Sequence, residues 1–115
     1  MIELYGLSNC DKVQAAKKWL NENNIAFDFH DFKDNVLNKS LITEWIKQKG
    51  LDILINKKST TWRNFPEKER NLLLSENTAP DMLIDYPALI KRPVLVHKIN
   101  IIVGFNKNEY LLLKT

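Results

Sequence analysis

The sequence contains very little cysteine. Cys10 is the only cysteine in 115 residues, so an intramolecular disulfide is excluded. A zinc site built on several cysteines is excluded for the same reason, because such sites require Cys at defined spacings. Chains without a disulfide framework are typical of reducing compartments, and we therefore expect a cytoplasmic protein.

Glycine, histidine and long apolar runs are also scarce. Only 3 glycines occur, and no glycine-rich phosphate loop is present. The 2 histidines, His30 and His97, are isolated from any metal-ligand pattern, so no metal site is expected. No apolar run approaches the roughly 20 residues of a membrane-spanning helix, and no basic segment followed by an apolar run marks a secretory signal. A net charge of +3 is too small to indicate nucleic-acid binding.

The first third of the chain has the pattern of a strand, a helix and a second strand. A short apolar run at residues 2–5 predicts a strand. Val13, Ala16, Trp19 and Leu20 then recur at helical spacing within residues 11–23. Residues 25–32 alternate partly between apolar and polar side chains and predict another strand. A strand, helix and strand in this order predict two parallel strands.

The rest of the chain predicts a helical insert followed by a hairpin. Residues 33–85 have helical periodicity in several short segments, with a polar, basic loop at residues 56–63. Residues 94–97 and 99–104 are apolar runs separated by one residue, which predicts an antiparallel pair. A short helix, capped by Asn106, is expected to end the chain with the leucines at 111–113 packing inward. The sequence thus predicts one α/β domain over residues 1–115, with a small mixed sheet.

Cys10 lies where the first strand gives way to the helix. Two interpretations are open: an inert, buried cysteine, or a reactive thiol at a helix N-terminus. Unpaired N–H groups at such a terminus stabilise a thiolate, and polar Ser8, Asn9 and Asp11 surround the position. Val13 occupies the position where a dithiol motif would have its second cysteine. A reactive Cys10 therefore needs a partner thiol from another molecule, such as glutathione or a separate redoxin.

Arg92 is the basic residue that stands out. It directly precedes Pro93 at the start of a predicted strand, so its backbone is restricted. An arginine offers a planar fork of donors that suits oxyanions and carboxylates, and Arg92 is placed to face a thiolate at the first helix. For Lys58, Arg63 and Lys91, scattered surface charge is the alternative interpretation.

Four segments together resemble a known family. They are Leu4-Tyr5-Gly6-x-x-x-Cys10-Asp11, Asn56-x-x-x-Thr60-Thr61-Trp62-Arg63, Pro87-Ala88-Leu89-Ile90-Lys91-Arg92-Pro93 and Val103-Gly104-Phe105. In this order they resemble the arsenate reductase (ArsC) and Spx superfamily, and most closely its YffB-like branch. The resemblance covers essentially the whole chain.

The resemblance implies a thioredoxin-like fold, with a helical insert between the second and third strands and a cis bond between Arg92 and Pro93. It implies that Cys10 is the catalytic cysteine. Arsenate reductases of this family surround the oxyanion with three arginines, and Arg92 matches one of them. In the loop where another is expected, the chain has Asn56 and Lys58, with Arg63 further on; where the last is expected, it has Gly104-Phe105. This pattern favours the YffB-like branch, for which glutathione-dependent thiol reduction has been proposed.

The sequence therefore predicts a monothiol, glutathione-dependent thiol–disulfide oxidoreductase that acts as a monomer with no bound cofactor. Cys10 and Arg92 are the expected catalytic residues. The residues expected to bind the substrate or glutathione are Ser8, Asn9, Lys12, Lys58, Arg63, Lys91 and Pro93. Two alternatives remain: a glutaredoxin-dependent arsenate reductase, and a Spx-like regulator that binds RNA polymerase.

Overall fold

The structure is a computed structural model that describes residues 1–114. It divides into two compact units. The first, called here the sheet unit, contains Met1–Val36 and the segment that begins at Arg92; the second, the helical unit, is Leu37–Lys91.

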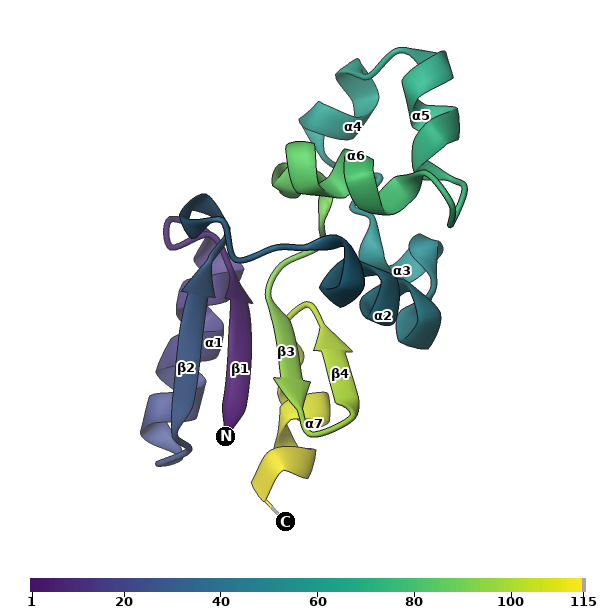
Figure 1. Ribbon diagram of the computed structural model, residues 1–115. Helices are drawn as coiled ribbons and strands as arrows, with labels where there is room; N and C mark the ends of the chain where they lie inside the picture. Colours follow the sequence, from purple (N-terminus) through teal and green to yellow (C-terminus); the bar gives the residue numbers. More distant parts are fainter. Residues whose placement is uncertain (115) are drawn as a thin grey trace. The chain divides into compact units, whose positions relative to one another are not determined.

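The sheet unit contains four strands and a long helix. In chain order these are β1 (Ile2–Gly6), α1 (Asp11–Glu22), β2 (Phe27–Asp31), β3 (Val94–His97) and β4 (Asn100–Val103). The strand order is β2-β1-β3-β4, with β1 and β2 parallel and β3 antiparallel to both of its neighbours (Figure 1). The predicted parallel pair and the predicted hairpin are both confirmed.

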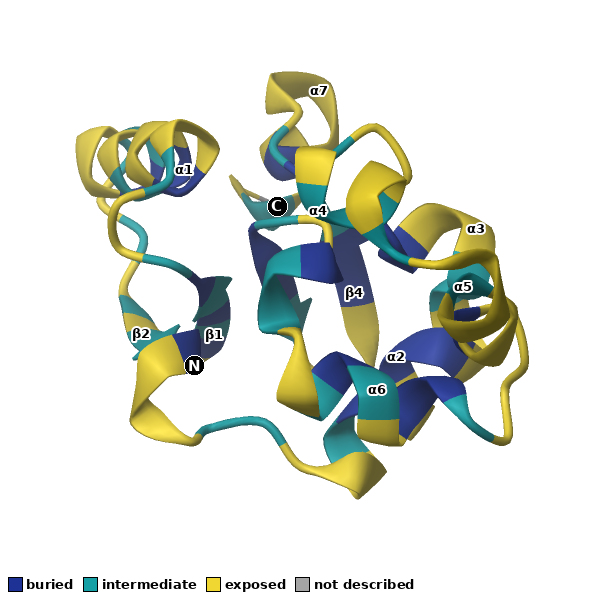
Figure 2. Ribbon diagram, turned by 90° about the horizontal axis from the view of Figure 1, so that it is seen from above, coloured by how far each residue is buried: buried dark blue, intermediate teal, exposed yellow. Residues whose placement is uncertain are grey.

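Apolar side chains of α1 and β1 form the core of this unit. Val13, Ala16 and Leu20 of α1 are buried, and the last two belong to the same cluster as Ile2 and Leu4. Figure 2 shows exposed and buried residues on the same helix, as its amphipathic sequence requires. Truncating a fully buried leucine such as Leu4 to alanine typically costs about 2–5 kcal/mol of folding stability. The sheet and α1 therefore pack together through one core on either side of the turn that joins them.

The C-terminal segment closes the same core. The short helix α7 (Lys107–Tyr110) is capped by Asn106, whose side chain accepts the N–H of Glu109 at 3.2 Å. The 3-10 turn η3 (Leu111–Lys114) follows. The expectation that residues 111–113 pack inward is wrong for Leu111 and Leu112, because their side chains are exposed. The end of that expected helix, Thr115, lies outside the described residues.

The helical unit consists of short helices. They are α2 (Lys39–Lys49), α3 (Leu51–Leu54), α4 (Thr60–Asn64), α5 (Glu67–Leu73), α6 (Ala79–Asp85) and the 3-10 helix η2 (Pro87–Leu89). Asn38 caps α2 by accepting the N–H of Leu41 at 2.8 Å. The loop predicted at residues 56–63 is wrong from residue 60 onward, where α4 begins. Ser59 caps that helix by accepting the N–H of Trp62 at 3.1 Å.

The helical unit is inserted between β2 and β3, where the sequence predicted an insert at 33–85. Before it, η1 (Phe32–Asp34) forms a single turn after β2. The mixed four-stranded sheet with this insert is the thioredoxin-like α/β fold that the resemblance implied. A single domain over the whole chain remains a prediction, since the fold is described as two units. None of the helices in residues 1–114 has the length and apolar character needed to cross a bilayer.

Candidate active site

Cys10 is the N-cap residue of α1, directly before its first residue, Asp11. Its backbone is extended (φ −90°, ψ 129°), and its carbonyl accepts the first helical N–H, from Gln14, at 3.0 Å. A tight turn leads to it from β1, closed by the N–H of Cys10, which donates to Leu7 O at 3.1 Å. The thiol is half-buried. The predicted strand-to-helix junction is therefore where the only thiol lies.

Burial and three neighbouring groups act on the acidity of this thiol. Burial alone raises the pKa of Cys10, because it disfavours the charged form. The backbone N–H of Val13, the guanidinium of Arg92 and the backbone N–H of Lys12 all stabilise the thiolate. Together they outweigh the burial, so the pKa of Cys10 lies below that of an ordinary thiol. The backbone N–H groups lie at the sulfur without the alignment of a regular N-cap hydrogen bond.

Arg92 reaches Cys10 because of the strand order. β3 runs antiparallel to β1, with Val94 paired to Tyr5, so the start of β3 lies beside the end of β1. The Arg92–Pro93 peptide bond is cis, as the resemblance implied, and Gly104 donates its N–H to Pro93 O at 2.8 Å. The Arg92 side chain hydrogen-bonds to Cys10 and adds a favourable charge to its thiolate.

Gly6 permits the close approach of β1 and α1 at this point. A Cβ at Gly6 would lie 2.6 Å from Cγ2 of Val13, well inside van der Waals contact. Val13 is fully buried, so it cannot move aside into solvent. Val13 therefore has two roles: its N–H stabilises the Cys10 thiolate, and its side chain packs the first turn of α1 against β1.

The other predicted site residues fall into two groups. Ser8, Asn9 and Lys12 are exposed in the turn and the first turn of α1, and Pro93 is buried behind Arg92. Lys58, Arg63 and Lys91 belong to the helical unit, where Lys91 donates its N–H to Leu54 O at 2.7 Å. The structure thus gathers the first group with Cys10 and Arg92 in one unit. Glutathione binding remains a prediction for both groups.

Two residues near this turn, Gln14 and Asp31, were not predicted from the sequence. Gln14 donates its side-chain amide to Ser8 O, and the Asp31 carboxylate accepts the N–H of Lys33 at 3.0 Å, which lowers the pKa of Asp31. Asp31 is the last residue of β2 and is paired with Gly6 in the parallel register. The predicted parallel pairing of these two strands could have identified Asp31, because the carboxyl ends of adjacent parallel strands meet at one edge of a sheet.

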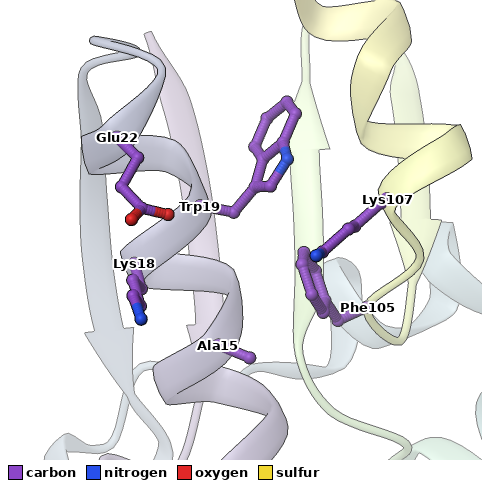
Figure 3. A pocket seen from close by; sticks show the side chains of 6 residues that line it. All are labelled: Ala15, Lys18, Trp19, Glu22, Phe105 and Lys107. Atoms are coloured by element: carbon purple, nitrogen blue, oxygen red, sulfur yellow. The ribbon is translucent and has the colours of Figure 1, made fainter.

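A small cavity of about 180 Å³ lies elsewhere on the sheet unit. Its lining residues are Ala15, Lys18, Trp19, Glu22, Phe105 and Lys107 (Figure 3). In Figure 3 the Trp19 and Phe105 rings come from α1 and from the segment before α7, on facing sides of the hollow. Neither Cys10 nor Arg92 lines this cavity, so it does not provide the binding space of the thiol.

The histidines do not form part of the candidate site. His30 Nε2 lies 3.1 Å from Glu3 Oε2, and the His30 ring stacks on Tyr5 with the centroids 4.7 Å apart. Within residues 1–114, no group of three or more His, Cys, Asp or Glu side chains is arranged to hold a metal ion. The chemistry that the described residues offer is therefore that of a stabilised thiolate.

Comparison with known proteins identifies relatives over nearly the whole chain. A model of the ArsC family matches residues 5–113. An uncharacterized protein of Haemophilus influenzae is 43% identical over 110 residues, which cover 96% of each chain. A solved structure of a protein named YFFB superimposes with a TM-score of 0.91 at 32% identity, covering 97% of each chain. The global transcriptional regulator Spx 1 of Bacillus cereus is 28% identical over 115 residues, covering 95% of this chain and 83% of that protein.

Proposed function

The chain belongs to the ArsC family, and from this membership and the surroundings of Cys10 we propose that it is a monothiol thiol–disulfide oxidoreductase that uses glutathione. One observation carries the proposal. A guanidinium and two backbone N–H groups converge on the only thiol of the chain and lower its pKa. A structural cysteine needs none of these, whereas a nucleophilic one needs its thiolate populated at neutral pH.

The proposed reaction has two exchange steps. The Cys10 thiolate attacks the glutathione sulfur of a mixed disulfide between glutathione and a substrate thiol, and the bond between the two sulfurs breaks. The substrate leaves as a thiolate and takes a proton from water, while Cys10 is left bonded to glutathione. The thiolate of a second glutathione then attacks this sulfur, releasing glutathione disulfide and regenerating the Cys10 thiolate. In sum, one mixed disulfide and one glutathione thiol become one free substrate thiol and one glutathione disulfide, so the incoming glutathione thiol is the reductant.

The chain supplies the groups that this reaction needs at the sulfur. Arg92 and the N–H groups of Lys12 and Val13 stabilise Cys10 both as attacking and as leaving thiolate. Glutathione carries two carboxylates, for which the cations Lys58, Arg63 and Lys91 are the proposed partners. The exposed Ser8 and Asn9 and the backbone at Pro93 are the proposed contacts for its peptide part.

The test is the acidity of Cys10 and its modification by glutathione. Iodoacetamide alkylation as a function of pH reports the thiolate fraction, and mass spectrometry after exposure to glutathione disulfide reports the mixed disulfide. We expect a pKa below that of a free thiol in the wild type, a higher pKa in Arg92→Ala and a smaller rise in Arg92→Lys, which keeps the charge but loses the fork. An ordinary pKa in the wild type, or no glutathione adduct at any pH, would overturn the proposal.

Two other functions have specific support. Similarity to Spx 1 over 95% of the chain supports a transcriptional regulator, and pull-down with RNA polymerase tests it. Valine at position 13 argues against a switch based on an internal disulfide, because no second cysteine exists. Family membership supports arsenate reduction, which an assay with arsenate, glutathione and glutaredoxin tests. The resemblance matches only Arg92 to one of the three arginines of such enzymes, so we expect this activity to be weak.

A further inference from the structure

Two aromatic rings of the sheet unit pack against its core with only part of their surface. Trp19 of α1 and Phe105, two residues before α7, are both half-buried. Each ring packs edge-on against Tyr110, with centroid distances of 5.6 Å for Trp19 and 4.9 Å for Phe105. Tyr110 is fully buried, so its contacts hold both rings in place from the core side. The two rings are therefore fixed in the free protein.

The cavity described above has these two rings on its facing sides (Figure 3). Its volume of about 180 Å³ is smaller than the roughly 300–1,000 Å³ of pockets for drug-sized ligands. An engineered apolar cavity of about 150 Å³ binds benzene, so this one has room for a single six-membered ring with a small substituent. Aromatic rings pack favourably against other aromatic rings. The size and the walls of the cavity thus favour an aromatic ligand with one ring.

The charged side chains at this cavity favour an anionic ligand. Lys18 and Glu22 are one turn apart on α1, where their opposite charges largely cancel. Lys107 comes from the other side, at the start of α7, and in Figure 3 its amine lies beside the Phe105 ring. Among residues 1–114, no carboxylate forms an ion pair with Lys107. The cavity therefore has an excess of one positive charge, which attracts a negatively charged substituent.

We propose that this cavity is a binding site for a small aromatic carboxylate of the benzoate class. The ring of the ligand lies between Trp19 and Phe105, and its carboxylate pairs with the exposed Lys107. The site is separate from the thiol, because Trp19 follows Cys10 by nine residues along α1, which is about 13.5 Å at 1.5 Å per residue. The inference goes beyond the proposed function and does not depend on it.

Titration of isotope-labelled protein with benzoate, followed by NMR, tests the proposal. The chain has 3 tryptophans, and Trp19→Phe identifies the indole N–H signal of Trp19. Trp45 and Trp62 belong to the helical unit and serve as internal controls. We expect saturable shifts of the Trp19 indole N–H and of the backbone N–H groups of Phe105 and Lys107, with a Kd on the order of 1 mM because so small a ligand makes few contacts. The absence of saturable shifts at these three groups overturns the proposal.

Two analogues separate the contribution of the ring from that of the charge. Benzyl alcohol keeps the ring without the charge, and acetate keeps the carboxylate without the ring. We expect benzyl alcohol to bind about two- to fivefold more weakly than benzoate, which is the contribution of an exposed ion pair, and acetate to give no saturable shift. Equal affinities for benzyl alcohol and benzoate overturn the anionic class, and equal affinities for acetate and benzoate overturn the role of the rings.

Variants of the protein locate the site. Lys107→Gln should weaken benzoate binding about two- to fivefold and leave benzyl alcohol binding unchanged, whereas Lys68→Gln, which removes an exposed charge of α5, should change neither. Ala15→Leu fills the cavity from an exposed position of α1 with a good helix former, so it should abolish the binding of both ligands while circular dichroism shows the chain folded. Benzoate binding that survives Ala15→Leu, or equal effects of Lys107→Gln and Lys68→Gln, overturns the inference.

Discussion

Substituting alanine for Gly6 tests the contact between the end of β1 and the first turn of α1. The new Cβ would lie 2.6 Å from Val13 Cγ2, where ordinary contact begins at 3.4 Å, so the two groups must separate by about 0.8 Å. Val13 is fully buried and lies in a helix, where a β-branched side chain has one strongly preferred rotamer. The separation therefore requires a shift of α1 itself. Overpacking of this kind costs about 1–3 kcal/mol, and we expect the upper half of that range.

Removing the opposing methyl groups should relieve the overlap. Val13→Ala alone loses two buried methyl groups, which costs about 1.6 kcal/mol at roughly 0.8 kcal/mol per group. In the double variant Gly6→Ala/Val13→Ala, the alanine Cβ fills part of the space, so the total loss should be smaller than the sum of the single losses by about 1 kcal/mol or more. Urea titrations followed by circular dichroism give all four free energies of unfolding.

Gly50→Ala is the control for a glycine substitution without a steric clash. Its Cβ would meet no atom within 4 Å, and its cost comes from the positive φ of 84° alone. That cost should be the same with and without Val13→Ala. If the cost of Gly6→Ala is equally independent of Val13, the packing argument at the base of the candidate site is wrong.

Three further predictions concern single side chains. Because the pKa of Cys10 is lowered in the folded state, the unfolded chain binds more protons at pH values between the folded and unfolded pKa. The stability of the wild type relative to Cys10→Ser should therefore rise as pH increases toward about 8.5 and should be lost as pH falls through the folded pKa. Urea titrations at several pH values measure this difference, and a difference that does not change with pH would contradict the prediction. The Tyr110 hydroxyl is buried without a hydrogen-bond partner among residues 1–114, and burial raises the pKa of Tyr110. Tyr110→Phe should therefore leave the free energy of unfolding unchanged or increase it by about 1 kcal/mol. A loss above about 1 kcal/mol in thermal or urea unfolding would show that the hydroxyl has a partner. Asn38→Ala should cost about 1 kcal/mol by removing the cap of α2, as urea unfolding can measure, while Asn38→Ser should retain most of it.

Much of the sheet unit could be predicted because its sequence signals agree with its tertiary environment. Of the four apolar residues at helical spacing, Val13, Ala16 and Leu20 are buried in α1 and Trp19 is half-buried. The position of Cys10 at a strand-to-helix junction follows from the change between the apolar run at residues 2–5 and the helical spacing at residues 11–23. The cis bond at Pro93 came only from the resemblance to a family, since nothing local in the sequence fixes the isomer.

The features that were missed depend on short local bonds or on register. The helix α4 is only five residues long, so its sequence shows no clear apolar periodicity, and its polar composition indicated a loop. The helix begins where the Ser59 side chain caps it. Asp31 comes to the end of β1 only once β2 is paired with β1, which places it opposite Gly6. Leu111 and Leu112 resemble core residues in sequence, but the 3-10 turn leaves both exposed.

Position 13 shows why this thiol lacks an internal partner. The Val13 side chain packs against Gly6 in the core, and its N–H stabilises the Cys10 thiolate. A cysteine side chain directed into this contact would be buried against β1 and would not be free to attack a disulfide at Cys10 without moving the first turn of α1. The exposed residues beside the sulfur are Ser8, Asn9 and Lys12. In the proposed reaction, a second thiol therefore has to come from another molecule, and the turn beside the sulfur is the segment that Gln14 ties to α1.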